Sequence, residues 1–188
     1  MRRFTALLLA LALSLSLCAP ALAESPVAQA MATVAAFVQQ TLDDSGLNYI
    51  VDEDDPTRFI LLYESNDGRM GDVYAYLDAY SSGVLIWASY YEDIPLDRID
   101  ESVRFVNMVN AELLGRKYFI TPDTGTVVYE LHFFMDANNL GAYESEKIVD
   151  YLAAIVSDID YDIDYFAAIM SGETAENAFA MYMADLDK

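Results

Sequence analysis

Residues 72–115 read DVYAYLDAYSSGVLIWASYYEDIPLDRIDESVRFVNMVNAELLG, and this stretch decides the fold. Its first nine residues alternate between aliphatic side chains and larger polar or aromatic ones, which predicts a β-strand over residues 72–80. Residues 81–83 are Ser-Ser-Gly, a composition typical of turns. An apolar, aromatic segment that contains the only tryptophan, Trp87, then predicts a returning strand over residues 84–91. The stretch therefore begins with a β-hairpin.

A helix is predicted to follow this hairpin over residues 95–114. Pro95 at its start and Gly115 just past its end are residue types that commonly begin and end helices. Acidic residues fall in or near its first turn, where the helix dipole favours negative charge. The helical spacing predicts a buried stripe of Leu96, Ile99, Val103, Val106, Val109 or Asn110, and Leu113.

The remaining elements are predicted from the same kinds of signal. The predicted helices cover residues 25–46, which begin with Ser25-Pro26, residues 144–170, and the segment after Thr174, and the predicted strands cover residues 47–51, 58–64, 118–121 and 126–135. The resulting order is α-β-β-β-β-α-β-β-α-α. Short connections between neighbouring strands imply an antiparallel sheet of five to six strands, with helices packed on one face, in the α+β class.

Residues 144–170 are open to two interpretations. Their apolar residues step by three and four, as in a helix, whereas residues 158–165 alternate strictly, as in a strand. We predict one continuous helix because the helical stripe runs through the alternating part and no Gly or Pro divides it.

The N-terminus has the features of a secretory signal peptide over residues 1–23. A short basic region precedes an apolar run over residues 4–17, and Ala21-Leu22-Ala23 is a cleavage site of small residues. We therefore expect an exported protein, in the periplasm or outside the cell, with a single domain over residues 24–188. A lipoprotein acylated at Cys18 is the alternative, and the bulky Leu17 before it is against that alternative.

Composition excludes several classes of function. The formal net charge is −21, which disfavours binding to nucleic acid or to anionic lipid, so we expect neither nucleic-acid nor membrane partners after signal cleavage. The only cysteine lies in the predicted signal peptide, which removes disulfides, cysteine nucleophiles and thiolate metal sites from the mature chain.

No motif in the sequence predicts catalysis, a cofactor or a metal site. His132, the only histidine, lies in mid-strand without a marked serine nucleophile. Four aspartates over residues 158–164 lack the glycine and glutamate of a calcium loop, and we interpret them as a solvated acidic helix face. The acidic turn over residues 52–55 is a better candidate for weak cation binding, although a solvated turn is the simpler interpretation. We predict no catalytic residue, no metal and no cofactor.

The aromatic side of the central hairpin is the candidate binding surface. Its members are Tyr74, Tyr76, Tyr80, Trp87 and Tyr91. The aliphatic side suits packing against helices, which would leave the tyrosine side exposed to a partner. Packing of the C-terminal helices over the tyrosines is the other arrangement that the sequence allows.

Several short motifs, taken in order, resemble the YbjN-type domain, a family described as bacterial sensory transduction regulators with a fold like that of type III secretion chaperones. The motifs are Gly46-Leu47-Asn48-Tyr49, Asp72-Val73-Tyr74-Ala75-Tyr76, Pro95, Phe105-Val106-Asn107-Met108-Val109-Asn110, Leu114-Gly115-Arg116, Pro122-Asp123-Thr124-Gly125 and Gly172-Glu173-Thr174-Ala175-Glu176. The resemblance implies a sheet packed against helices, protein partners and frequent self-pairing. It supplies no catalytic residues, and the export signal departs from the usual form of the family.

Together these features predict an exported, non-enzymatic domain that binds a protein or peptide, in a chaperone-like or regulatory role, with a homodimer as a further expectation. Two other classes stay open: an acidic envelope hydrolase with an unrecognised carboxylate pair, and a cation-binding envelope protein.

Overall fold

A six-stranded antiparallel sheet forms the centre of the protein, whose computed structural model describes residues 25–63, 73–89 and 93–186. The strands are β1 (Ile50–Val51), β2 (Arg58–Tyr63), β3 (Val73–Tyr80), β4 (Gly83–Ser89), β5 (Arg116–Ile120) and β6 (Val127–Phe134). They lie in the order β1-β2-β3-β4-β6-β5. The helices are α2 (Pro26–Asp44), α3 (Ile99–Glu112), α4 (Ala142–Met170) and α5 (Ala175–Leu186), with a short 3-10 helix, η1 (Leu96–Arg98), before α3. The predicted α+β class and element order are confirmed.

Local capping explains where the helices begin and end. The hydroxyl of Ser25 accepts a hydrogen bond from the Ala28 amide at 3.1 Å, which caps α2. Gly46, with φ of 67°, adopts the left-handed conformation just past the end of α2 that a glycine takes up without strain. The ambiguous segment forms a single helix, α4, because Ile148, Leu152 and their successors give it a continuous apolar side against the sheet.

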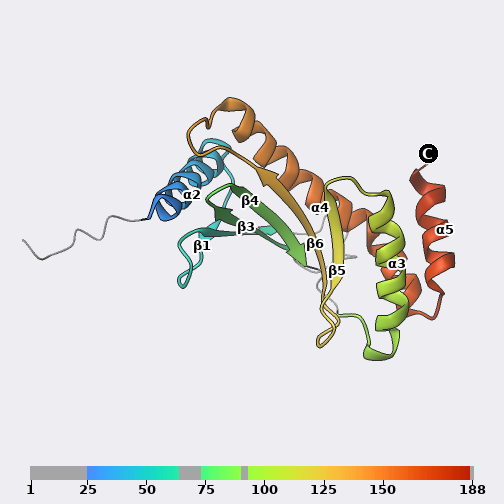
Figure 1. Cartoon of the computed structure of the whole chain (residues 1–188). Coiled ribbons are helices and arrows are strands. Elements are labelled where there is room, and N and C mark those ends of the chain that lie inside the picture. The colour runs from blue at the N-terminus through green and yellow to red at the C-terminus, as the bar shows by residue number, and fades with distance from the viewer. Residues whose placement is uncertain (1–24, 64–72, 90–92, 187–188) are drawn as a thin grey trace, which may run out of the picture.

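Helices cover one face of the sheet only. Figure 1 shows α4 running across the strands, with α2 beside it and with α3 and α5 next to each other beyond the edge strand β5. The β3 side chains on the covered face, Val73, Ala75, Leu77 and Ala79, are almost completely buried, as the alternation predicts. The opposite face of the described strands therefore holds the candidate binding residues.

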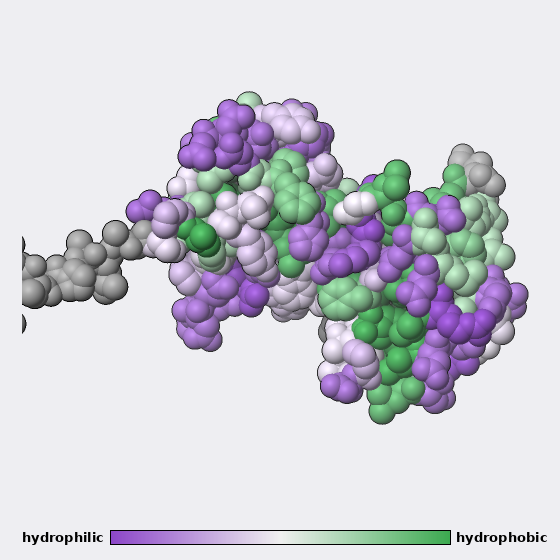
Figure 2. Space-filling view, viewed as in Figure 1, coloured by the Kyte–Doolittle hydropathy of each residue, from purple (hydrophilic) through white to green (hydrophobic). Residues whose placement is uncertain are grey.

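The predicted buried stripe of α3 is correct at Val106 and Val109 and wrong at Leu96 and Val103. Leu96 and Val103 are exposed, by 72% and 37%, while Ser102 and Phe105 are buried instead. Val106 and Val109 are buried as expected. The helix carries apolar residues on two sides. Phe105 lies on the buried side, where its ring packs against Phe166 of α4 with centroids 5.2 Å apart. Figure 2 shows the resulting hydrophobic area, in green, over the region of α3.

Side chains at the start of α3 form hydrogen bonds with the connection between α4 and α5. The guanidinium of Arg98 donates to the carbonyl of Ile169 at 2.8 Å and to that of Glu173, so it binds the carboxyl end of α4. The carboxylate of Glu101 accepts from the Ala175 amide at 2.8 Å, at the first turn of α5, which lowers the pKa of Glu101. These contacts fasten α5 to the rest of the fold.

Candidate functional site

The uncovered face of the sheet, called the open face below, carries apolar and aromatic side chains on the described strands. Its apolar members are Ile50, Ile60, Leu62, Tyr74, Tyr76, Tyr80, Leu85, Trp87, Phe119, Val128 and Phe134. Tyr74 and Tyr80 are each 45% exposed, and Phe134 is 77% exposed. Contiguous exposed aromatic residues are uncommon on monomeric proteins and are typical of interaction surfaces.

Tyr76 and Trp87 form the fixed centre of the open face. They are directly opposed cross-strand neighbours on β3 and β4, and their rings stack with centroids 3.9 Å apart and planes 7° apart. Packing at this distance makes both rings only half accessible and raises the pKa of the Tyr76 hydroxyl through burial. The stack therefore offers one rigid aromatic platform rather than two mobile side chains.

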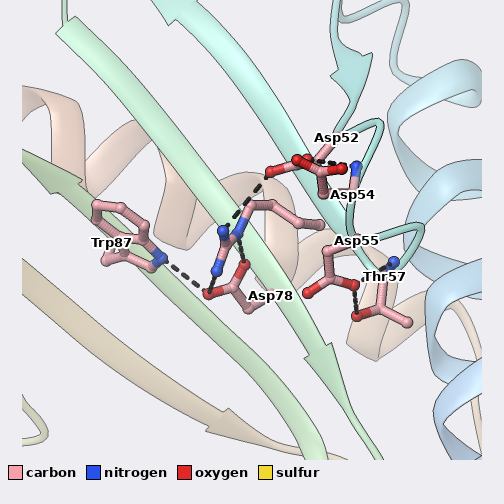
Figure 3. Close-up of polar contacts among 7 residues, drawn as sticks. Asp52, Asp54, Asp55, Thr57, Asp78 and Trp87 are labelled. Atoms are coloured by element: carbon pink, nitrogen blue, oxygen red, sulfur yellow. Dashed lines mark hydrogen bonds and ion pairs between the residues drawn. The ribbon is translucent and has the colours of Figure 1, made fainter.

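A polar network holds Trp87 in place. The indole Nε1 donates to Oδ2 of Asp78 at 3.0 Å, and Asp78 also accepts two hydrogen bonds from Arg58, at 2.6 and 3.2 Å. Figure 3 shows Trp87 pointing at Asp78, with Asp52 approaching from the turn before β2. Asp52 lies 3.6 Å from the Arg58 guanidinium. Because Asp78 is only 7% exposed, this charge-assisted network is partly shielded from water.

Grooves lined by described residues lie on this side of the molecule and at its rim. One of about 410 Å³ is lined by Asp78, Leu85, Trp87, Phe119, Thr121, Thr126, Val128 and Glu130. A second, of about 390 Å³, is lined by Asn48, Tyr49, Ile50, Ile60, Leu62 and Tyr74. A third, of about 220 Å³, lies at the β3–β4 turn and includes Tyr80, His132 and Phe134. Each groove is lined by aromatic side chains, which suits contact with the side chains of an extended polypeptide.

The structure places four of the five predicted binding residues. Tyr74 and Tyr80 are exposed, Tyr76 and Trp87 are stacked and half-buried, and Tyr91 lies outside the described residues. Their binding role stays a prediction. Sequence reasoning missed Leu62, Phe119 and Phe134, which the same alternation along β2, β5 and β6 places on this face.

The β5 edge of the sheet is closed by a side chain of α3. The amide of Asn110 donates to the Tyr118 carbonyl and accepts from the Tyr118 amide, both at 2.7 Å. It thus satisfies the backbone of the edge strand as a neighbouring strand would. Asn110 therefore has a structural role, whereas Asn107 of the same motif is exposed.

The acidic run on α4 is not a solvated face throughout, which corrects the sequence interpretation. Asp162 is only 6% exposed and accepts a hydrogen bond from the Tyr118 hydroxyl at 2.5 Å. Asp158, one turn earlier, accepts from the Tyr129 hydroxyl at 2.8 Å and pairs with Arg116. Burial raises the pKa of Asp162 to about 6, and the nearby charge of Asp158 adds to the rise.

His132 and the acidic turn are the remaining candidates from the sequence. His132 lies on the open face, half-exposed, with Nε2 3.6 Å from Oε1 of Glu130. In the acidic turn, Asp52 accepts from the Asp54 amide and Asp55 from Thr57, so these carboxylates stabilise the turn rather than converge. Within residues 25–63, 73–89 and 93–186, no group of three potential metal ligands is present. Nor does any helix in these ranges combine the length and apolar character needed to cross a bilayer.

The fold defines an α+β protein in which helices cover one face of an antiparallel sheet. No family model and no curated protein matches the sequence. Among solved structures, the chain is similar to YbjN, described as "a putative transcription regulator from E. coli", with a TM-score of 0.51 and 16% identity. The match covers 66% of this chain and 86% of that one. The fold is therefore of the YbjN type.

Proposed function

We propose that this protein is an exported, non-enzymatic domain that binds an extended polypeptide on the open face of its sheet. The observation that carries the proposal is the exposed aromatic surface, in which Tyr74 and Tyr80 lie on either side of the Tyr76–Trp87 stack along β3. The likeness to YbjN, described as "a putative transcription regulator", agrees with a regulatory role.

The chemistry of the surface favours a polypeptide over a small substrate. The grooves are open and spread across several strands, whereas small-molecule sites are enclosed and few. Tyrosine and tryptophan contribute large contact area at low cost in conformational entropy. The hydrolase alternative has less support. Asp158 and Asp162 bind tyrosine hydroxyls and line none of these grooves. The two carboxylates that share a groove, Asp78 and Glu130, are already paired with Arg58 and Lys117.

Binding is tested with a defined unfolded polypeptide, ribonuclease A whose disulfides have been reduced and alkylated. Fluorescence anisotropy of the labelled polypeptide should show that the double variant Tyr74→Ser, Tyr80→Ser binds about tenfold more weakly than the wild type. The matched control is Tyr143→Ser, Tyr161→Ser, because these tyrosines are also exposed but lie on α4. Equal affinities for both double variants would contradict the proposal.

Export is tested separately by expressing the full chain in a bacterium and measuring the mass of the protein in the periplasmic fraction. Cleavage after Ala23 gives a mature chain that begins at Glu24. A full-length mass in the cytoplasm would reject export, and a lipid-modified chain that begins at Cys18 would reject cleavage after Ala23.

A further inference from the structure

The groove beside Trp87, called the Trp87 groove below, combines an aromatic ring with two acidic side chains. Asp78 and Glu130 line it together with Trp87. Both carboxylates are poorly exposed, their side chains at 9% and 13%. Asp78 is paired with Arg58, whereas Glu130 contacts only the exposed Lys117 among the lysines and arginines of the described residues, so Glu130 is the carboxylate that a partner cation can reach.

The aromatic wall of this groove is held before any ligand arrives. Tyr76 stacks on the indole ring, and Asp78 accepts the hydrogen bond from Nε1. Beyond Trp87 in the same cross-strand row lies Glu130. The rim at the β5–β6 turn is also fixed, because the Ile94 amide donates to the Gly125 carbonyl at 2.9 Å. A preformed site loses little entropy on binding.

We propose that the Trp87 groove binds a lysine or arginine side chain of the extended polypeptide. This inference rests on the proposed function and names the chemistry of the partner. The cationic head lies between the indole ring and the Glu130 carboxylate, where it gains a cation–π contact and an ion pair. The methylene stem packs against Leu85, Phe119 and Val128, which form the apolar wall.

Charge on the molecule supports a basic occupant. Glu130 already attracts the chain's own cation, since Lys117 Nζ lies 2.8 Å from Oε1. Lys117 itself is largely exposed, so a partner cation can share Glu130 or displace Lys117 from it. The formal net charge of −21 attracts basic segments over longer distances and repels acidic ones.

The position of Trp87 gives a direct assay, because it is the only tryptophan in the chain. Three short peptides that differ at one central residue, which is lysine, norleucine or glutamate, are titrated while the indole fluorescence is followed. The lysine peptide should bind about tenfold more tightly than the norleucine peptide, and the glutamate peptide should bind most weakly.

Substitutions in the Trp87 groove test whether the preference for lysine arises there. Glu130→Gln should reduce the advantage of lysine over norleucine to about twofold, and Lys117→Met, which removes the competing cation, should increase it. Glu146→Gln is the matched control, since it makes the same change of charge at an exposed position on α4. The circular dichroism spectrum verifies that each variant is folded. If Glu130→Gln does not fold, Lys117→Met still tests the proposal.

The outcomes separate this inference from the proposed function. Equal binding of the lysine and norleucine peptides overturns the basic preference and leaves polypeptide binding intact. A lysine preference that persists in folded Glu130→Gln overturns the assignment to the Trp87 groove. Failure of all three peptides and of the unfolded polypeptide to bind overturns both proposals.

Discussion

At the scale of single residues, Asp162 makes stability depend on pH. Its pKa is raised from 3.8 to about 6 because the carboxyl group is buried, so the folded state favours the protonated form. The stabilisation is fully present below the unfolded pKa and is lost as the pH rises through about 6. The raised pKa corresponds to at most about 3 kcal/mol.

We therefore expect Asp162→Asn to be more stable than the wild type at about pH 8 and close to it at about pH 4. Urea unfolding across this range measures the difference in the free energy of unfolding. Tyr118, Tyr182, Asp158 and Arg116 also act on Asp162 electrostatically, and they stay in place in this variant. Glu146→Gln on the exposed side of α4 is the control. Parallel pH profiles for wild type and Asp162→Asn would show that Asp162 is not the titrating group.

Asn110 is the second residue whose role can be measured. Its amide satisfies two backbone groups of Tyr118, so Asn110→Ala should lower the free energy of unfolding by about 1–3 kcal/mol. Asn107→Ala, three residues earlier and exposed, should change it by less than about 0.5 kcal/mol. Chemical denaturation compares the two variants, and equal effects would argue against closure of the β5 edge by Asn110.

At the scale of elements, α3 has two apolar sides, of which one is buried and the other is exposed. Val106 is 4% exposed and Val103 is 37% exposed. Val106→Ser should therefore cost about 2–4 kcal/mol, whereas Val103→Ser should cost less than about 1 kcal/mol. Thermal or urea unfolding gives both values. A larger loss for Val103→Ser would show that Val103 is buried in the folded protein, as the sequence predicts.

At the scale of the whole molecule, charge and exposed apolar area act in opposite directions. The formal net charge of −21 opposes association of two copies, while Leu96, Val103 and Leu114 leave an apolar side of α3 open. We propose that these exposed side chains pair two copies of the chain, in a dimer that strengthens as salt screens the repulsion. Sedimentation equilibrium at low and high salt tests this, with Leu96→Ser, Val103→Ser as the variant that should stay monomeric. A wild type that is monomeric at every salt concentration would exclude the dimer.

The sequence predicts the fold where side chains recur at a regular spacing or where a residue caps a helix. The alternation in β3 identifies which side chains share a face, and Ser25 and Gly46 define the ends of α2 through local hydrogen bonds and backbone conformation. Such signals act within a few residues, so element type and order follow from the sequence alone. Along α3 they identify Val106 and Val109 as buried but fail at Leu96 and Val103, because apolar residues occur on two sides of the helix and local spacing does not distinguish them.

Part of the candidate site can likewise be predicted from the sequence, and part of it depends on the tertiary structure. The residues Tyr74, Tyr76, Tyr80 and Trp87 are identified by their alternation, but the stacking of Tyr76 on Trp87 needs the pairing of β3 with β4. The acidic wall of the Trp87 groove cannot be predicted from local patterns, because Asp78 and Glu130 come from β3 and β6, which are far apart along the chain.

The sequence by itself determines the α+β class, the order of elements and the division of the central hairpin into an aliphatic and an aromatic side. Only the tertiary structure decides that α2 and α4 cover the aliphatic side, that Asp162 is buried against Tyr118, and that Trp87 borders an acidic groove. The reason is physical. Alternation and capping are properties of neighbouring residues, whereas burial and electrostatic environment arise from contacts between segments that folding brings together.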